Sequence, residues 1–193
     1  MSELETRLIE AALAAGAAKA TLIPQRQIVL SAEFRKICES NACGNYGRCW
    51  MCPPDTGDIE TAMAQVRQYP WGLLYQTVGE IEDSFDIEGM SEAGVRHAQV
   101  SQRLETAGRA AGIGEHFHLS AGGCRLCPEC AKKEDQPCRH PDRALHGRQG
   151  AGIDVYRTTK STDLKYINGA NTVTFFGLLL YKDCLLYTSD AAD

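Results

Sequence analysis

The sequence predicts an α+β fold, an α/β sandwich in which a small mixed β-sheet is flanked by helices and carries two cysteine-rich loops. Segments with helical and with extended periodicity alternate along the chain. The composition, with 44% hydrophobic and 23% charged residues in a chain of 193, is typical of a globular protein with one core. Eight of the nine cysteines fall into two groups. We therefore expect residues 1–181 to form a single cysteine-rich domain.

The first part of the chain predicts a helix, a short strand and a second helix. Ser2 and Glu5 have the spacing of a capping box, and the helix that follows should end near Gly16. Residues 27–31 are β-prone and lead into the first cysteine group. Asp58 can cap the second helix. The inward positions of the two helices are Leu4, Leu8, Ala11 and Ala15 in the first, and Ile59, Ala62, Met63 and Val66 in the second.

The second part continues the alternation. Residues 71–81 predict a strand, and Ser91 is expected to cap a longer helix that Gly112 to Gly114 ends. Its inner face consists of Val100, Leu104, Ala107 and Ala111. Three further elements are expected: a strand at 115–120 that leads into the second cysteine group, a helix within 150–164, and a strand at 172–181 that is continuous in apolar and β-branched residues.

The end of the chain needs separate treatment. Residues 183–193 resemble the translated read-through of a sequencing adapter, so we expect 182–193 to be a non-native tail. Cys184 is therefore left out of the functional argument.

Charge and hydropathy exclude several classes of partner. The formal charge of −5 argues against nucleic acid, because phosphates require a basic surface. The longest apolar run, 173–181, is too short to span a bilayer, and the first residues lack the pattern of a secretion signal. We therefore expect a cytoplasmic protein with no membrane or nucleic-acid partner. In a reducing compartment, clustered cysteines are metal ligands before they are disulfides.

The second cysteine group has the spacing of an iron–sulfur site. Cys124, Cys127 and Cys130 stand at every third residue, and Cys138 follows after seven intervening residues. A 4Fe–4S cluster needs one thiolate for each iron, which three closely spaced cysteines and one remote cysteine supply. Zinc more often uses two separate Cys-x-x-Cys pairs. The spacing favours a 4Fe–4S cluster, with zinc as the alternative.

The first cysteine group fits no single standard motif. It consists of Cys38, Cys43, Cys49 and Cys52, in a polar segment where core packing cannot explain them. These four could hold a second cluster, or a zinc ion with Cys38/Cys43 and Cys49/Cys52 as pairs. Alternatively, each site takes a cysteine from the other group, as in two-cluster ferredoxins.

The histidines and the basic residues near the second group give weaker signals. His97 is expected on the surface of the third helix, and His140 in a solvated loop. His116 and His118 share one face of a strand and could form a site, although such a pair is more often structural. A short basic cluster consists of Arg125, Lys132, Lys133 and Arg139.

These motifs together resemble a family of predicted metal-binding proteins, DUF2284. The resemblance rests on Cys38-x4-Cys43-Gly-Asn-Tyr-Gly with Cys49-x2-Cys52-Pro-Pro, and on Cys124-x2-Cys127-Pro-Glu-Cys130 with Pro137-Cys138-Arg-His-Pro-Asp. It continues through residues 152–155 and 171–177, and so covers nearly all of the chain up to Tyr181. The resemblance implies metal binding through these cysteines, in prokaryotes that are often anaerobic, and it supplies no reaction.

Three functional hypotheses follow. The first is an electron-transfer or redox accessory protein with one or two 4Fe–4S clusters on the eight cysteines and a redox protein as partner. The second is a zinc-stabilised structural or interaction module. The third is an iron–sulfur enzyme with an open iron position, although the sequence contains no Ser/His/Asp arrangement, paired carboxylates or nucleotide motif that favours it.

Overall fold

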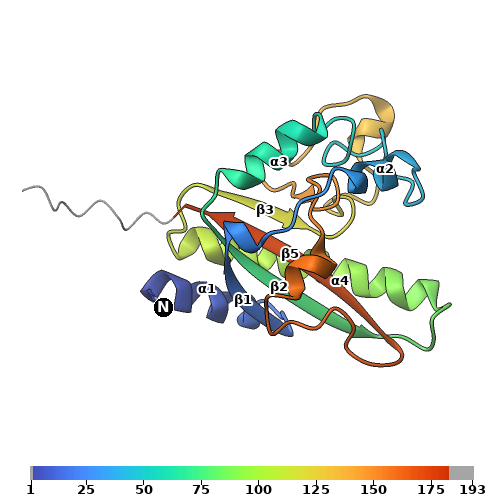
Figure 1. Ribbon diagram of the computed structural model, residues 1–193. Coiled ribbons are helices and arrows are strands. Elements are labelled where there is room, and N and C mark those ends of the chain that lie inside the picture. The colour runs from blue at the N-terminus through green and yellow to red at the C-terminus, as the bar shows by residue number, and fades with distance from the viewer. Residues whose placement is uncertain (1, 183–193) are drawn as a thin grey trace, which may run out of the picture.

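The computed structural model describes residues 2–182, which form one mixed sheet between two layers of helices (Figure 1). The expected α+β class is confirmed, while the expected tail at 183–193 lies outside the described residues. The helices are α1 (Glu3–Ala14), α2 (Glu33–Glu39), α3 (Ile59–Arg67), α4 (Ile87–Ala110) and α5 (Val155–Thr159), with short 3₁₀ turns η1 (Gln25–Gln27) and η2 (Ala131–Glu134). The strands are β1 (Lys19–Pro24), β2 (Trp71–Glu80), β3 (His116–Ser120), β4 (His146–Gly147) and β5 (Thr172–Tyr181).

The sheet has the strand order β1-β2-β5-β3-β4. The first four strands in this order pair antiparallel, and β4 pairs parallel with β3, which makes the sheet mixed. The long strands β2 and β5 pair over their whole length, from Trp71 opposite Tyr181 to Glu80 opposite Thr172. The last described strand in the sequence is therefore the central one in space.

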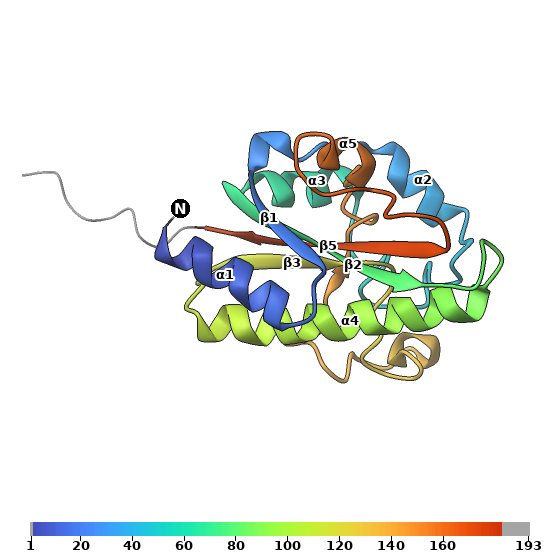
Figure 2. The ribbon, with the colours of Figure 1, turned by 90° about the horizontal axis from the view of Figure 1, so that it is seen from below.

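Each face of the sheet is covered by helices (Figure 2). The helices α1 and α4 cover one face, and α2, α3 and α5 lie on the other side. The apolar cluster under α1 and α4 includes Leu8, Leu104 and Leu179, and the cluster under α3 and α5 includes Val66, Ile153 and Leu178. Neither cluster contains any of the eight cysteines, so the cysteines lie outside the two apolar clusters that support the sheet.

Most of the expected elements are confirmed. In α1 the capping box is formed in both directions, because the Ser2 N–H donates to Glu5 and the Glu5 N–H donates to Ser2. In α3 the Asp58 carboxylate accepts from the backbone of Thr61 at 2.8 Å. The strands expected at 71–81, 115–120 and 172–181 are β2, β3 and β5.

Four local expectations were wrong. Residues 27–31 are no strand apart from an isolated bridge at Leu30, because the preceding residues 19–24 pair with β2 instead. The helix α4 begins at Ile87 rather than after Ser91, since Asp86 caps it through the Gly89 N–H at 2.8 Å. Of the region 150–164, only residues 155–159 are helical. The φ of +76° at Gly152 is not helical, so the helix begins after the cap residue Asp154.

The fourth correction concerns the first cysteine group. It was expected in a loop after a strand, but Cys38 lies within helix α2, and only the other three cysteines lie in the loop that follows. The second group does follow a strand, β3, as expected.

Candidate metal centre

The two cysteine segments, residues 38–58 and 124–140, are held against each other by side chains between them. The indole N–H of Trp50 donates to the backbone carbonyl of Gln136 at 2.9 Å. The Lys132 ammonium lies 2.8 Å from the Asp55 carboxylate and 4.1 Å from the centre of the Trp50 ring. Because Lys132 and Asp55 are only 19% and 14% exposed, solvent screens this ion pair less than a surface pair.

A buried arginine fixes the first segment to the rest of the fold. The guanidinium of Arg35 on α2 donates to the carbonyls of Gly57 at 2.7 Å and Gly150 at 2.8 Å. The first carbonyl follows the cysteine loop, and the second follows β4. Arg35 thus joins α2, the end of the first cysteine segment and the chain after β4 at one point.

Five cysteines line one small cavity of about 20 Å³. They are Cys49 from the first segment and Cys124, Cys127, Cys130 and Cys138 from the second. Cys49 is buried, and its sulfur interacts with the thiols of Cys52 and Cys130. His140 also lines this cavity, so its expected place in a solvated loop is only partly correct.

The other three cysteines of the first segment line a second cavity of about 160 Å³. They are Cys38, Cys43 and Cys52, of which Cys52 is buried and Cys43 is exposed. The cysteines are therefore grouped as five and three in space, although they are grouped as four and four in the sequence. Cys49 and Cys52 lie at the boundary between the two groups, with their thiols in contact.

Electrostatics distinguish Cys49 from the other thiols. A hydrogen bond from the Cys52 thiol lowers the pKa of Cys49 to about 6, against the effect of burial, and the backbone N–H groups of Met51 and Cys124 act in the same direction. The same hydrogen bond and burial raise the pKa of Cys52. Burial raises the pKa of Cys124 to about 11. Since the thiolate is the form that binds metal, the lowered pKa favours Cys49 as a ligand.

The donor set fits a soft metal. All eight cysteines are free thiols, and sulfur ligands select zinc or iron–sulfur clusters over magnesium or calcium. Within residues 2–182, no group of three or more His, Cys, Asp or Glu side chains already has the arrangement to hold a single metal ion. The sulfur atoms gather around cavities, and the fit to a metal rests on their chemistry and grouping.

The basic cluster expected from the sequence is divided among different partners. Lys132 pairs with Asp55, whereas Lys133 lies 2.6 Å from Glu129. Arg139 donates to the backbone carbonyl of Glu129 at 2.9 Å. These contacts brace the second cysteine segment.

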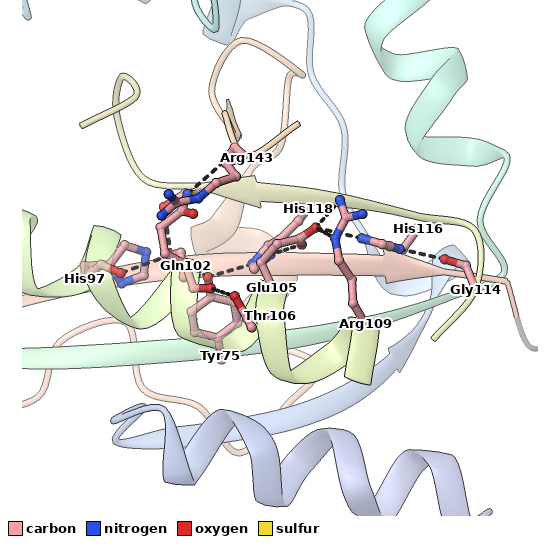
Figure 3. A network of polar contacts seen from close by, with 12 residues as sticks. Tyr75, His97, Gln102, Glu105, Thr106, Arg109, Gly114, His116, His118 and Arg143 are labelled. Atoms are coloured by element: carbon pink, nitrogen blue, oxygen red, sulfur yellow. Dashed lines mark hydrogen bonds and ion pairs between the residues drawn. The ribbon is translucent and has the colours of Figure 1, made fainter. Parts of the chain in front are cut away.

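A second polar site lies between α4 and β3, and the sequence indicated only its pair of histidines (Figure 3). His116 and His118, which the sequence placed on one face of a strand, both contact Glu105 of α4, at 2.9 and 3.0 Å. His97 was expected on the surface, but it is 1% exposed and shares a 2.9 Å hydrogen bond with Thr77. The expectation failed because α4 packs on the sheet with a wide face that includes polar residues.

No helix within residues 2–182 has both the length and the apolar character needed to cross a membrane.

The comparison with protein families gives one match. Residues 21–181 match the model of the family described as predicted metal-binding protein (DUF2284). The match includes all eight of the cysteines discussed above. No curated protein and no solved structure matches the chain.

Proposed function

We propose, on the premise that the chain belongs to this family of predicted metal-binding proteins, that it carries one or two 4Fe–4S clusters and serves in electron transfer or as a redox accessory protein. The observation that carries the proposal is the gathering of five cysteines from two distant segments around one cavity. A redox protein as partner and a cytoplasmic location belong to the same proposal.

The main cluster would be held by the second segment. Cys124, Cys127 and Cys130 would bind three irons, and either Cys138 or Cys49 would bind the fourth. A bound 4Fe–4S cluster supplies one-electron redox chemistry. The pKa of Cys49, near 6, supports it as a ligand, and its position supports the exchange of a cysteine between the two groups.

The protein itself would protect and tune this centre. The Trp50 ring and the ion pair of Lys132 with Asp55 close the space between the two segments, which limits access of water. Charge and hydrogen bonding around the sulfurs would set the potential of a cluster, and the charge of Lys132 is largely offset there by its pairing with Asp55.

Metal analysis tests the proposal directly. Protein purified without oxygen should be brown, should contain iron and acid-labile sulfide, and should bleach on addition of dithionite. Cys49→Ser and Cys43→Ser form a matched pair of variants. Cys49 lines the five-cysteine cavity, and the exposed Cys43 lines the three-cysteine cavity. We expect Cys43→Ser to retain the main cluster, and loss of cluster content in either Cys49→Ser or Cys138→Ser identifies the ligand of the fourth iron. A colourless protein with stoichiometric zinc contradicts the proposal.

Zinc binding is the second candidate. The observation that favours it is the contact between the thiols of Cys49 and Cys52, which have the Cys-x-x-Cys spacing of a zinc knuckle. In that case the metal would mainly stabilise the two segments, and chelation would loosen them without any effect of oxygen.

An iron–sulfur enzyme is the third candidate. The observation that favours it is the cavity with only three cysteines, Cys38, Cys43 and Cys52, because three thiolates leave one iron of a cluster without a protein sulfur. Iron content that persists in Cys138→Ser but not in any of these three variants would support this candidate over the first.

A further inference from the structure

A continuous chain of hydrogen bonds crosses the interface between α4 and the sheet (Figure 3). It runs from Glu105 Oε2 to His118 Nδ1 at 3.0 Å, and from His118 Nε2 to the Tyr75 hydroxyl at 2.9 Å. It continues from Tyr75 to Ser101 Oγ at 2.7 Å and from Ser101 Oγ to Ser120 Oγ at 2.9 Å. Every link is within the range of a good hydrogen bond.

The middle residues of this hydrogen-bond chain are fully or almost fully buried, and its end residues Glu105 and Ser120 are also buried, at 6% and 7% exposure, but each lies next to an exposed feature. The side chain of His118 is 1% exposed, and Tyr75 and Ser101 are completely buried. At one end, Glu105 binds Arg109, whose side chain is 58% exposed. At the other end, Ser120 lines a groove of about 810 Å³. The hydrogen-bond chain therefore runs from just beneath the exposed Arg109 side chain of α4 to the wall of this groove.

The groove lies beside the candidate metal centre. Cys124 and Cys127 of the second cysteine segment line it together with Ser120. Its lining also contains Arg103, Arg125 and Arg143 and no aspartate or glutamate. A bound molecule in this groove would be anionic, and it would lie next to the cysteines.

A glycine makes room for the hydrogen-bond chain where Tyr75 crosses β5. The Tyr75 ring lies over Gly177 on the neighbouring strand, where any larger residue would overlap the ring. This position lets the Tyr75 hydroxyl reach past β5 to His118 on β3. Apolar residues of the cluster under α1 and α4 surround Tyr75, so the polar atoms of the chain depend on one another for hydrogen bonds.

We propose that Glu105, His118, Tyr75, Ser101 and Ser120 form a proton path between solvent and the groove beside the second cysteine segment. Each step breaks one N–H or O–H bond and forms the next one, so a proton that enters at Glu105 releases another at Ser120. The acceptor is an anionic small molecule in the groove. This part rests on the proposed function, in which a cluster held by the neighbouring cysteines would supply one-electron redox chemistry beside the groove while the path moves protons.

The chemistry of the side chains suits this role. A neutral imidazole donates at one nitrogen and accepts at the other, and a hydroxyl does both at one atom. Burial lowers the pKa of His118, against the effect of Glu105, which favours the neutral ring. Ser101 can also donate to the carbonyl of His97 at 3.0 Å. Its hydroxyl therefore keeps a hydrogen-bond acceptor when it is not donating along the path.

Hydrogen exchange at the His118 ring tests the path without any need for the substrate. The exchange rate of its ring N–H is measured by NMR in the metal-loaded protein. Glu105→Gln blocks proton entry at one end, Ser101→Ala breaks the path at the other, and the double variant blocks both. We expect the double variant to exchange at least about tenfold more slowly than wild type.

If the network is purely structural, the exchange rate of the His118 ring N–H should change in the opposite direction. Removing its hydrogen bonds loosens the packing, so exchange through local opening becomes faster. Exchange that is unchanged or faster in the double variant therefore overturns the proposal. Thr106→Val, which removes a hydroxyl of α4 outside the path, is the control and should leave the rate unchanged.

The experiment still gives an answer if one variant does not fold or if the bound metal is zinc. If Ser101→Ala does not fold, Tyr75→Phe breaks the path at the neighbouring link. Zinc in place of iron and sulfide would remove the electron source of the proposed function, but the exchange rates of His118 would still decide whether the proton path exists.

Discussion

The Lys132 ammonium lies 2.8 Å from the Asp55 carboxylate and joins the second cysteine segment to the first. This ion pair is partly buried, whereas the neighbouring pair of Lys133 with Glu129 is more exposed. The two lysines therefore offer a comparison within one short turn.

Replacing Lys132 should weaken metal retention. In Lys132→Met the contact between the segments is lost, and we expect metal release to a chelator to become about ten times faster, as is typical when a residue that supports metal ligands is changed. Lys133→Met should change the rate by less than a factor of about two, because exposed ion pairs contribute little. Equal release rates in the two variants would show that the Lys132 contact has no role in holding the segments.

Replacing Arg35 should reduce the stability of the fold. Arg35→Met leaves the carbonyls of Gly57 and Gly150 without their donor, so we expect a loss of about 2–3 kcal/mol in the free energy of unfolding. Lys36→Ala on the same helix removes only an exposed pair with Glu33 and should cost less than about 0.5 kcal/mol. Urea unfolding at fixed metal content measures both. A cost for Arg35→Met as small as that for Lys36→Ala would contradict the prediction.

Two glycine substitutions should have opposite effects. A Cβ at Gly177 would overlap the Tyr75 ring, so Gly177→Ala should destabilise the protein by about 1–3 kcal/mol. Gly108 lies within α4, where a Cβ would meet only ordinary contacts at 3.6 Å or more. Gly108→Ala should therefore stabilise the protein, by up to about 1 kcal/mol, through helix propensity. Thermal or urea unfolding measures whether each substitution lowers or raises the stability.

The stability contributed by His116 should depend on pH. A hydrogen bond to Glu105 raises the pKa of His116 above 6.5, against burial and the charge of Arg109, and the Gly114 carbonyl adds to the increase. A raised pKa in the folded state means that the stabilisation is complete below pH 6.5 and is lost as the pH rises through the folded pKa. Glu105 remains ionised throughout, because the hydrogen bonds from His116 and His118 outweigh burial and hold its pKa below the ordinary range.

The measurement is the difference in unfolding free energy between wild type and His116→Gln. This difference should be largest below pH 6.5 and should shrink at higher pH. A difference that is independent of pH between about 6 and 8.5 would mean that His116 does not change its charge on folding.

Metal removal should affect the cysteine segments and spare the sheet. Neither apolar cluster contains a cysteine, so chelation under reducing conditions should leave the far-ultraviolet circular dichroism nearly unchanged. Limited proteolysis should then cut within 38–58 and 124–140 before it cuts elsewhere. Cooperative loss of all secondary structure would show that the metal supports the whole fold.

The sequence predicted the elements whose signals are local. The capping residues Ser2 and Asp58 and the apolar run at 172–181 identified α1, α3 and β5, because caps and strand composition act within a few residues. It did not predict β1, since Lys19–Pro24 is a short segment that ends in proline and forms a strand through its pairing with β2. Ser91 was mistaken for a cap because Asp86 provides an equally good one earlier.

The eight cysteines remain predicted metal ligands, and the structure groups them differently from the sequence. Spacing cannot show that Cys49 lies with the second group, because that depends on the contacts between Trp50, Gln136 and Lys132. The chain from Glu105 to Ser120 was missed as well. Its members come from three elements, and the pair His116 and His118 was the one signal that pointed toward it.

The central position of β5 has a consequence for synthesis on the ribosome. Both β2 and β3 pair with β5, and β5 is the last of the described strands to be translated. Until it emerges, the nascent chain has two sheet fragments with open edges and apolar faces, a state that invites aggregation or chaperone binding. The cysteine segments are complete before that moment, so their thiols would be available for metal delivery before the sheet has closed.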